Sequence, residues 1–357
     1  MKICFVLPQV LRKPVGGYKI AFEYANRLKD EGEDVTILFL NGEALQRFRL
    51  PKMLRNIAIG AITKIEPKWF KLNPGIKKYS STQGNLERKL EKIDIAIATG
   101  AGTVDETYKY FPKSRKAYLI QGYETWFFDK ERLNKTFAYG MDNIVIAKWL
   151  KKIVDQYSQK PSILISNPID INCYCCSHSI CNRKKYTVGT LYHTAEVKGF
   201  KYTYEALLKV KKKFPELEVK MFGTSKPDWV LPSWIEFTLN ATQKETVEIY
   251  NEISIFICAT IEEGFGLTGL EAMSCGAALV STSYEGVKEY AVDKVNCLLS
   301  PICDSSALAE NIEYLIENDE KRIELAMSGM KMAQNHSWEN AMNIFRRYIQ
   351  SVKYNQI

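Results

Sequence analysis

The sequence predicts an α/β fold with two domains, each built around a parallel sheet. Short apolar runs suited to buried strands alternate with segments of helical periodicity along the whole chain. With 357 residues the chain is too long for one ordinary core and fits two domains of about 150 to 200 residues. Pro168 restricts Asn167 to extended conformations, which suits a boundary, so we expect domains at residues 1–166 and 167–337.

The first domain opens with a strand, a glycine turn, a helix and a second strand. Residues 2–7 form a short apolar strand, and residues 18–31 carry apolar side chains at helical spacing. A right-handed crossover then makes the strand at 35–40 parallel to the first. Gly16 and Gly17 lie in the turn without completing the G-x-G-x-x-G dinucleotide motif, and a tight turn alone is the alternative to a ligand contact.

The same alternation extends the first sheet. Ligands of open α/β sheets bind at the carboxyl ends of strands, so the turn beginning at Gln121 is a candidate site. Its polar side chains are Gln121, Tyr123 and Glu124, and a strand-end turn held by aromatic packing is the alternative. The predicted strands are 93–98, 117–121, 143–146 and 163–165, and the predicted helices are 103–110 and 148–157.

The second domain repeats the pattern and ends in an amphipathic helix. The apolar stripe along residues 338–352 predicts that this last helix packs on a core. The predicted strands are 187–192, 218–222, 235–238, 253–258, 278–282 and 296–299, and the predicted helices are about 202–213, 243–251, 305–318 and 320–335.

Residues 253–276 carry the strongest functional signal. The buried strand ends at Glu262 and Glu263, two glycines follow, and Thr268 opens a helix that carries Glu271. The turn therefore lies at the carboxyl end of a strand, where the unpaired N–H groups and the positive end of a helix dipole suit a phosphate. Thr268-x-x-Glu271 is also a capping box, which is the purely structural interpretation of Glu271.

Residues 263–276, EGFGLTGLEAMSCG, resemble the EGFGLPxxEAMACG signature of retaining, nucleotide-sugar-dependent glycosyltransferases of family 4. Residues 166–170 also resemble the segment that joins the two domains in that family. The resemblance implies the GT-B fold, with two Rossmann-like parallel-sheet domains facing each other across a cleft. It also implies that a C-terminal helix, residues 338–357, crosses back to the first domain, which would bind the acceptor while the second binds the nucleotide sugar.

The loop after the strand at 187–192 departs from the family pattern. Lys198 and Gly199 match the end of its G-R-x5-K-G motif, but Tyr192 stands where the arginine is expected, with His193 beside it. The resulting YHxxxxKG pattern resembles a branch that we associate with rhamnosyl transfer and surface polysaccharides. Lys198 would then neutralise the donor diphosphate, and His193 would be a second donor to phosphate.

The resemblance also assigns roles to the remaining candidates. Glu263 would act on the donor sugar, and Glu271 would bind the ribose hydroxyls. The amides of residues 264–268 would hold sugar hydroxyls and diphosphate. In full, the implied catalytic residues are Glu263 and Lys198; the donor-binding residues are Glu271, Gly264, Phe265, Gly266, Leu267, Thr268, His193, Gly223 and Gly17; and the acceptor-side residues are Gly16, Gln121, Tyr123 and Glu124.

The implied chemistry needs no metal or other cofactor. No metal-binding D-x-D segment is evident, and the three histidines all follow residue 166, which excludes a histidine base from the first domain. The resemblance then implies a front-face reaction in which the leaving phosphate takes the acceptor proton. The donor would be a UDP-, GDP- or dTDP-sugar. The alternatives are a GT-B epimerase or phosphorylase and a non-catalytic sugar-nucleotide-binding scaffold.

Charge is unevenly distributed along the chain. The net charge is +8, and residues 1–166 carry 29 Lys and Arg against 17 Asp and Glu. The basic stretch at 45–79 also contains apolar groups, a mixture that suits attachment to an anionic membrane surface. A solvated loop is the alternative; no nucleic-acid motif occurs, so we expect no nucleic-acid partner. Neither a membrane-spanning run nor a signal peptide is evident, so we expect a cytoplasmic protein, peripheral on the inner face of the cell membrane.

Residues 173–181 contain four cysteines and a histidine. Their spacing, C-x-C-C-x-H-x-x-C, matches no known zinc ribbon or finger, and a second ligand pair is missing. We therefore expect a solvated linker and no metal. The nine cysteines, some of them in predicted strands, fit a reducing compartment.

Overall fold

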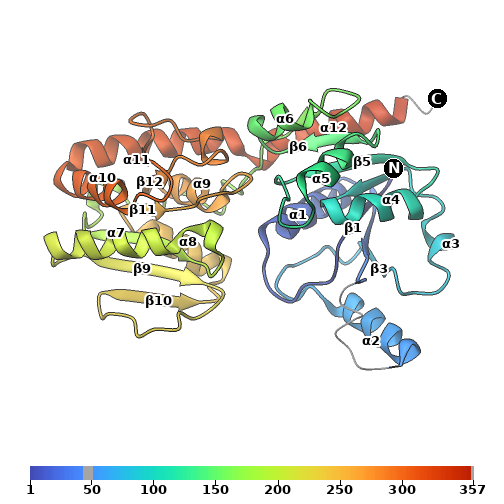
Figure 1. Ribbon diagram of the computed structural model, residues 1–357, viewed down its shortest axis with the longest axis horizontal. Helices are drawn as coiled ribbons and strands as arrows, with labels where there is room; N and C mark the ends of the chain where they lie inside the picture. The colour runs from blue at the N-terminus through green and yellow to red at the C-terminus, as the bar shows by residue number, and fades with distance from the viewer. Residues whose placement is uncertain (43–50, 355–357) are drawn as a thin grey trace. The chain divides into compact units, whose positions relative to one another are not determined.

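The computed structural model describes residues 1–42 and 51–354, which form two compact units (Figure 1). One comprises Met1–Ile165 and Ile344–Ile357, and the other comprises Ser166–Asn343. The domain limits expected from the sequence differ slightly from these units. The expected boundary follows residue 166 instead of residue 165, and the expected first domain also includes residues 338–343 of the last helix. Among the described helices, none is long and apolar enough to cross a membrane.

Unit 1 contains a seven-stranded parallel sheet in the order β3-β2-β1-β4-β5-β6-β7. The central strand β4 is buried along its whole length and β1 in all but its first residue, as expected for a parallel sheet covered by helices on both faces. This sheet confirms the predicted α/β class. The strands are β1 (Lys2–Leu7), β2 (Asp34–Phe39), β3 (Lys77–Ser80), β4 (Ile95–Ala98), β5 (Arg115–Ile120), β6 (Asp142–Val145) and β7 (Ile163–Leu164).

The sequence pattern did not predict four elements of unit 1, namely the helices α2, α3 and α5 and the strand β3. β3 begins with two lysines and lies at the sheet edge, where charge prevents pairing with other chains. The basic stretch is therefore partly helix and strand; its residues Arg47 and Arg49 lie outside the described residues. The helices are α1 (Gly16–Asp30), α2 (Lys52–Ile65), α3 (Leu86–Leu90), α4 (Val104–Tyr110), α5 (Lys130–Phe137) and α6 (Lys148–Val154).

Unit 2 contains a six-stranded parallel sheet in the order β10-β9-β8-β11-β12-β13. The strand order reverses between β8 and β11, as it does between β1 and β4 in unit 1, and such switch points are where open α/β sheets bind ligands. The strands are β8 (Thr187–Tyr192), β9 (Glu218–Gly223), β10 (Ile235–Leu239), β11 (Ile255–Cys258), β12 (Ala278–Thr282) and β13 (Cys297–Ser300), and the helices are α7 (Phe200–Lys213), α8 (Gln243–Glu252), α9 (Leu267–Ser274), α10 (Ser305–Glu317) and α11 (Asp319–Ala333).

The last helix, α12 (Trp338–Tyr354), begins in unit 2 and ends packed on unit 1. The ring of Phe345 lies 4.8 Å from that of Tyr24, centroid to centroid. The Tyr348 hydroxyl donates to Asp142 at 3.1 Å, and Arg346 pairs with Glu31 at 2.7 Å. The predicted return of this helix to the first domain is thus confirmed, although residues 355–357 lie outside the described residues.

The cysteine-rich segment 173–181 is only partly the solvated linker that its composition suggested, since residues 175, 177–179 and 181 are exposed but two others are buried. Tyr174 and Ile180 are buried against unit 2. The buried guanidinium of Arg183 then donates to the carbonyl oxygens of Tyr250, Ile253 and Cys275 at 2.5 to 3.1 Å. The segment is therefore anchored to the rest of unit 2 at Tyr174 and Ile180. Within residues 1–42 and 51–354, no cluster of three or more potential metal ligands occurs.

Candidate functional site

The loop after β8 lies against the turn after β11, which brings two distant parts of the sequence together. The Val197 carbonyl accepts from the Ile261 amide at 2.8 Å. Gly199 adopts φ +62, and a Cβ there would lie 1.8 Å from the Ala259 carbonyl oxygen. Only glycine allows this approach, which explains the glycine that follows Lys198.

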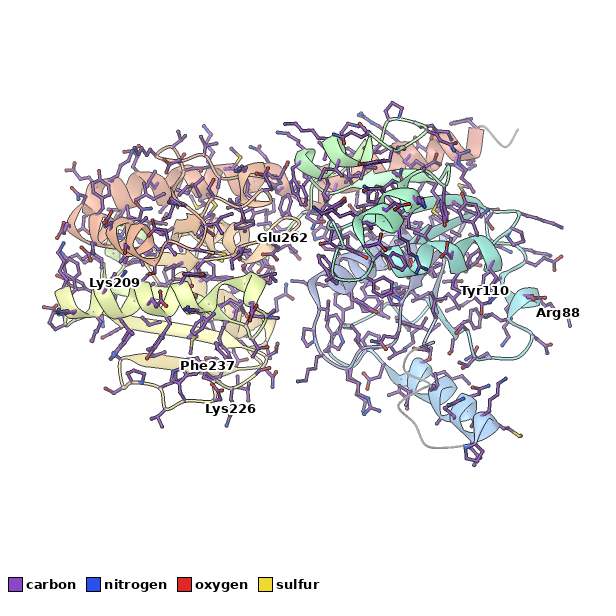
Figure 2. All side chains as sticks on the ribbon, viewed as in Figure 1. Arg88, Tyr110, Lys209, Lys226, Phe237 and Glu262 are labelled. Atoms are coloured by element: carbon purple, nitrogen blue, oxygen red, sulfur yellow. The ribbon has the colours of Figure 1, made fainter. Side chains whose placement is uncertain are left out.

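Lys198 and Glu263 form an ion pair at the switch point of unit 2. Their Nζ and Oε1 atoms are 2.6 Å apart, and the side chains are 24% and 26% exposed. Both line a small cavity of about 20 Å³ that also includes Thr268 at the start of α9. The structure thus brings together three predicted site residues that are separated by up to seventy positions. Neighbouring Glu262, labelled in Figure 2, is exposed on the same turn.

Two buried tyrosines, Tyr284 and Tyr290, contact the turn that contains Gly264 and Gly266. Gly266 has φ +93, and a Cβ there would lie 1.9 Å from the Tyr284 hydroxyl oxygen. The Tyr290 hydroxyl donates to the Gly266 carbonyl at 2.6 Å. Because the carbonyl and the next amide of a trans peptide point in opposite directions, the Leu267 N–H points away from Tyr290. The turn therefore presents a backbone donor at the positive end of α9.

The sequence pattern did not predict the residues that support this turn. A Cβ at Gly286 would lie 2.6 Å from the Glu263 carbonyl oxygen and 2.7 Å from the Phe265 nitrogen, so glycine lets the two segments touch. Tyr284 and Gly286 follow β12 directly, at the same edge of the sheet as Glu263. A tyrosine and a glycine shortly after the neighbouring strand were the sequence signal that could have indicated this contact.

The alternative interpretation, in which Thr268 caps the helix, is not the arrangement found. The helix begins at Leu267 with Gly266 as N-cap, and no side chain caps it. Thr268 is the second helical residue, so the capping box that would have explained Glu271 structurally does not form. Glu271 is instead 7% exposed, with the Tyr250 hydroxyl 3.5 Å from its Oε2.

Two other predicted donor-side residues, Phe265 and Gly223, have evident packing roles. The Phe265 side chain is buried, with its ring 5.5 Å from that of Tyr290 and 5.6 Å from that of His336. Gly223 pairs with Tyr192, whose carbonyl oxygen would lie 2.6 Å from a Cβ at that position. Any ligand contact by Phe265 or Gly223 would therefore come from the backbone. Gly264 lies half-buried in the turn between Glu263 and Phe265.

Tyr192 does not take the place of the expected arginine. Its buried ring makes edge contacts with Phe200, Trp229 and Phe237, the last of which is labelled in Figure 2, at centroid distances of 4.8 to 6.1 Å. The ring belongs to an aromatic cluster of the unit 2 core. Lys198, in its ion pair with Glu263, is then the cation that this loop brings to the candidate site.

His193 is held as a neutral ring. Its Nδ1 accepts from the Ala195 amide at 2.9 Å, so the remaining proton sits on Nε2. Burial lowers the pKa of His193, and the charge of Lys198 lowers it further, while Glu263 opposes the shift. The ring can therefore donate one hydrogen bond through Nε2 without carrying a positive charge.

Unit 1 holds a larger cavity, of about 720 Å³, at the carboxyl ends of its strands. The Gln121 amide donates to the Gly17 carbonyl at 3.1 Å, which joins two predicted residues at its wall. Gly16 and Gly17 are the first two residues of α1, not part of the preceding loop as predicted. The lining side chains include Gln9, Tyr18, Gln121, Glu124, Trp126 and Phe127.

Glu124 and Tyr123 lie differently around this cavity. The Glu124 carboxylate lines it and accepts from the Ala101 amide at 2.8 Å, just before α4. Burial raises the pKa of Glu124, and the hydrogen bond from Ala101 lowers it by less. The Tyr123 hydroxyl donates to Asn134 on α5 at 2.9 Å, so this side chain packs on α5 and does not line the cavity.

The raised pKa of Glu124 makes a prediction about stability. A carboxyl whose pKa is higher in the folded state contributes stability at low pH that is lost as pH rises through the folded pKa. We therefore expect the free energy of unfolding of the wild type, relative to Glu124→Gln, to fall between about pH 4 and neutrality. Urea unfolding across that range, with exposed Glu262→Gln as control, measures it. A difference that is independent of pH would contradict the prediction.

Comparisons with known proteins agree with this geometry. Residues 183–318 match the family model described as glycosyl transferases group 1. An uncharacterized glycosyltransferase of Methanocaldococcus jannaschii is 25% identical over 58% of this chain, which spans only 59% of that relative. One from Haemophilus influenzae is 22% identical over 91% of this chain and 93% of its own length.

Two further similarities concern a sugar polymer and a sugar nucleotide. The O-antigen chain mannosyltransferase B of Escherichia coli is 29% identical over 30% of this chain and 28% of that protein. The solved structure of Anabaena HepE in complex with UDP-glucose has a TM-score of 0.75 and 16% identity, covering 99% of this chain and 100% of HepE. The latter similarity establishes the fold.

Proposed function

We propose that this chain, which has the GT-B fold and matches the model of group 1 glycosyl transferases over residues 183–318, transfers a glycosyl group from a nucleoside-diphosphate sugar to a saccharide or polyprenyl-linked saccharide, with retention, in the synthesis of a surface polysaccharide. The observation that carries the proposal is the cluster of Lys198, Glu263 and the start of α9 at the switch point of unit 2. The O-antigen relative supports the choice of acceptor class.

The donor diphosphate would bind by replacing Glu263 as the partner of Lys198. The Leu267 and Thr268 amides and the α9 dipole add donors for the same charge, and His193 adds one through Nε2. Stabilising the charge that grows on the leaving diphosphate is the main catalytic task, and these groups can perform it without a metal ion. Glu263, released from Lys198, then faces the donor sugar.

In the transfer step one bond breaks, one bond forms and one proton is transferred. The bond between the sugar C1 and the diphosphate oxygen breaks, while the acceptor hydroxyl oxygen bonds to C1 on the same face. The hydroxyl proton passes to the leaving phosphate oxygen, so no protein base is required. The Glu263 carboxylate stabilises the positive charge that develops on the sugar ring.

The cavity of unit 1 supports binding of the acceptor. Gln121 and Glu124 provide polar groups for sugar hydroxyls, and the exposed rings of Trp126 and Phe127 provide apolar faces for sugar rings. A few placed polar groups among apolar walls are typical of small-molecule sites. Gly17 lies at the same wall, where Gln121 fixes its carbonyl.

The decisive experiment is thermal unfolding of the purified protein with UDP-, GDP- and dTDP-sugars in the presence of EDTA. A ligand that binds only the native state raises the unfolding temperature as its concentration exceeds Kd. We expect one nucleotide class to raise it and to support transfer to a lipid-linked saccharide extract. No shift with any of them would favour a non-catalytic scaffold and would overturn the proposal.

We also propose that α2 places unit 1 on an anionic membrane. Met53, Leu54, Ile57 and Ile65 are all more than half exposed on this helix. The helix also carries Lys52, Arg55 and Lys64 and contains no acidic residue. An apolar face flanked by basic residues suits a surface of anionic lipids, where each basic group adds about 1 kcal/mol. The ribbon places α2 beyond the edge strand β3 (Figure 1).

Vesicle sedimentation tests the membrane proposal. We expect the protein to sediment with phosphatidylglycerol vesicles at low salt and to remain in solution with phosphatidylcholine vesicles, because screening and neutral lipid both remove the attraction. Leu54→Asp with Ile57→Asp should weaken sedimentation at least about tenfold. Val230→Asp, at the most exposed apolar residue of unit 2, is the control. Equal sedimentation of the double variant would contradict the proposal.

A further inference from the structure

Two buried tyrosines contact the carboxylate of Glu271. The Tyr250 hydroxyl, on α8, lies 3.5 Å from Oε2. The Tyr174 hydroxyl hydrogen-bonds to the same carboxylate from the segment that follows the linker. The two phenol rings are 6.2 Å apart and both are buried. Glu271 therefore lies between hydroxyl donors from two separate elements.

Each tyrosine is itself held in place. The Tyr174 amide donates to the Asp170 carbonyl at 2.7 Å, and its carbonyl accepts from Ser274, on the same helix as Glu271. The ring of Tyr250 packs edge-on between Phe222 and Phe256, at centroid distances of 5.7 and 5.3 Å. Neither hydroxyl can turn away without disturbing the unit 2 core.

A buried carboxylate depends on such donors. Leaving it without hydrogen bonds costs far more than one neutral hydrogen bond contributes, so donors at fixed positions select its rotamer. Glu271 lies in the second turn of α9, and its helix begins at the turn that carries the Gly266 and Leu267 amides. Its orientation therefore decides whether the carboxylate faces a nucleotide whose diphosphate lies at that turn.

We propose that Tyr174 and Tyr250 are positioning residues of the nucleotide site, which hold the Glu271 carboxylate so that it accepts hydrogen bonds from the ribose hydroxyls of a nucleoside diphosphate. This inference rests on the proposed function, in which Glu271 binds the ribose. It also gives the 173–181 segment a role: Tyr174 follows Asp170 by four residues and extends the linker into the donor site.

The test uses hydroxyl-deletion variants of the full chain and calorimetric titration with UDP, GDP and dTDP. For the nucleotide that the wild type binds most tightly, we expect Tyr174→Phe to raise Kd about tenfold and Tyr250→Phe to raise it less, since the Tyr250 hydroxyl lies 3.5 Å from the carboxylate, at the limit of a hydrogen bond. Tyr348→Phe is the matched control, because it removes a buried tyrosine hydroxyl from the Asp142 carboxylate in unit 1. It should leave Kd unchanged.

A double-mutant comparison with Glu271 distinguishes a positioning role of the tyrosines from a general contribution to the stability of the fold. Glu271→Gln should raise Kd. Adding Tyr174→Phe to it should raise Kd no further, because Tyr174 acts on nucleotide binding only through the Glu271 carboxylate. Additive effects, or wild-type Kd values for Tyr174→Phe and Tyr250→Phe beside a weakened Glu271→Gln, would overturn the positioning role and leave the proposed function standing. A wild type that binds none of the three nucleotides would overturn the proposed function itself.

Discussion

Replacing Lys198 with alanine should lower kcat at least about a thousandfold while the protein stays folded, because the main cation facing the leaving diphosphate is lost. Glu263→Ala should have an effect of the same order, since no other carboxylate of the turn lines the small cavity between β8 and β11 among the residues the structure describes. Initial rates with the donor identified by thermal unfolding measure both losses. Wild-type turnover by either variant would refute the assignment.

The chain offers a close control for each substitution. Glu262→Ala removes the exposed carboxylate next to Glu263, and Lys201→Ala removes an exposed lysine three residues after Lys198. Both controls should turn over at rates close to the wild type. Because Lys198 and Glu263 are about a quarter exposed, their ion pair adds at most about 1 kcal/mol to stability. Large losses of activity with small changes in unfolding temperature are therefore the expected signature.

The sequence predicted the second domain more fully than the first because its strands are strongly apolar and its turns carry informative glycines. The strands β8 and β12 coincide with their predictions, and the turns that carry Lys198 and Glu263 follow strands as predicted, whereas their ion pair was not predicted. The buried tyrosines at 174, 250, 284 and 290 could not be found this way. Their role depends on which hydroxyl meets which carbonyl or carboxylate, and periodicity reports only that a position is apolar.

The elements of the first domain were harder to predict because the edge strand of its sheet is charged. The lysines of β3 and the mixed basic and apolar pattern of α2 gave no clear period, so neither the strand nor the helix was predicted. Glu124 illustrates a different limit. The sequence placed it at a strand end, but its burial and its bond to the Ala101 amide come from the way α4 begins beside β5. Tertiary contacts, not local pattern, decide such a group's chemistry.

Replacing Gly266 with alanine should destabilise the protein by about 2 to 4 kcal/mol, since the residue has φ +93 and the new methyl group would meet the buried Tyr284 hydroxyl. The variant should also bind the donor more weakly, because relief of the clash would rotate the peptide that presents the Leu267 amide. Urea unfolding and calorimetric titration measure the two effects. Gly84→Ala, where a Cβ meets nothing within 4 Å, is the control.

A second substitution tests the cause of that loss. Tyr284→Phe removes the oxygen that the methyl group would contact, so in the Gly266→Ala background it should restore about 1 kcal/mol of stability. The positive φ remains unfavourable for alanine, so recovery should be incomplete. Full additivity of the two substitutions would mean that backbone conformation alone requires glycine. A restored unfolding temperature with donor binding still weak would show that the turn serves the donor through its peptide orientation, beyond its contribution to the fold.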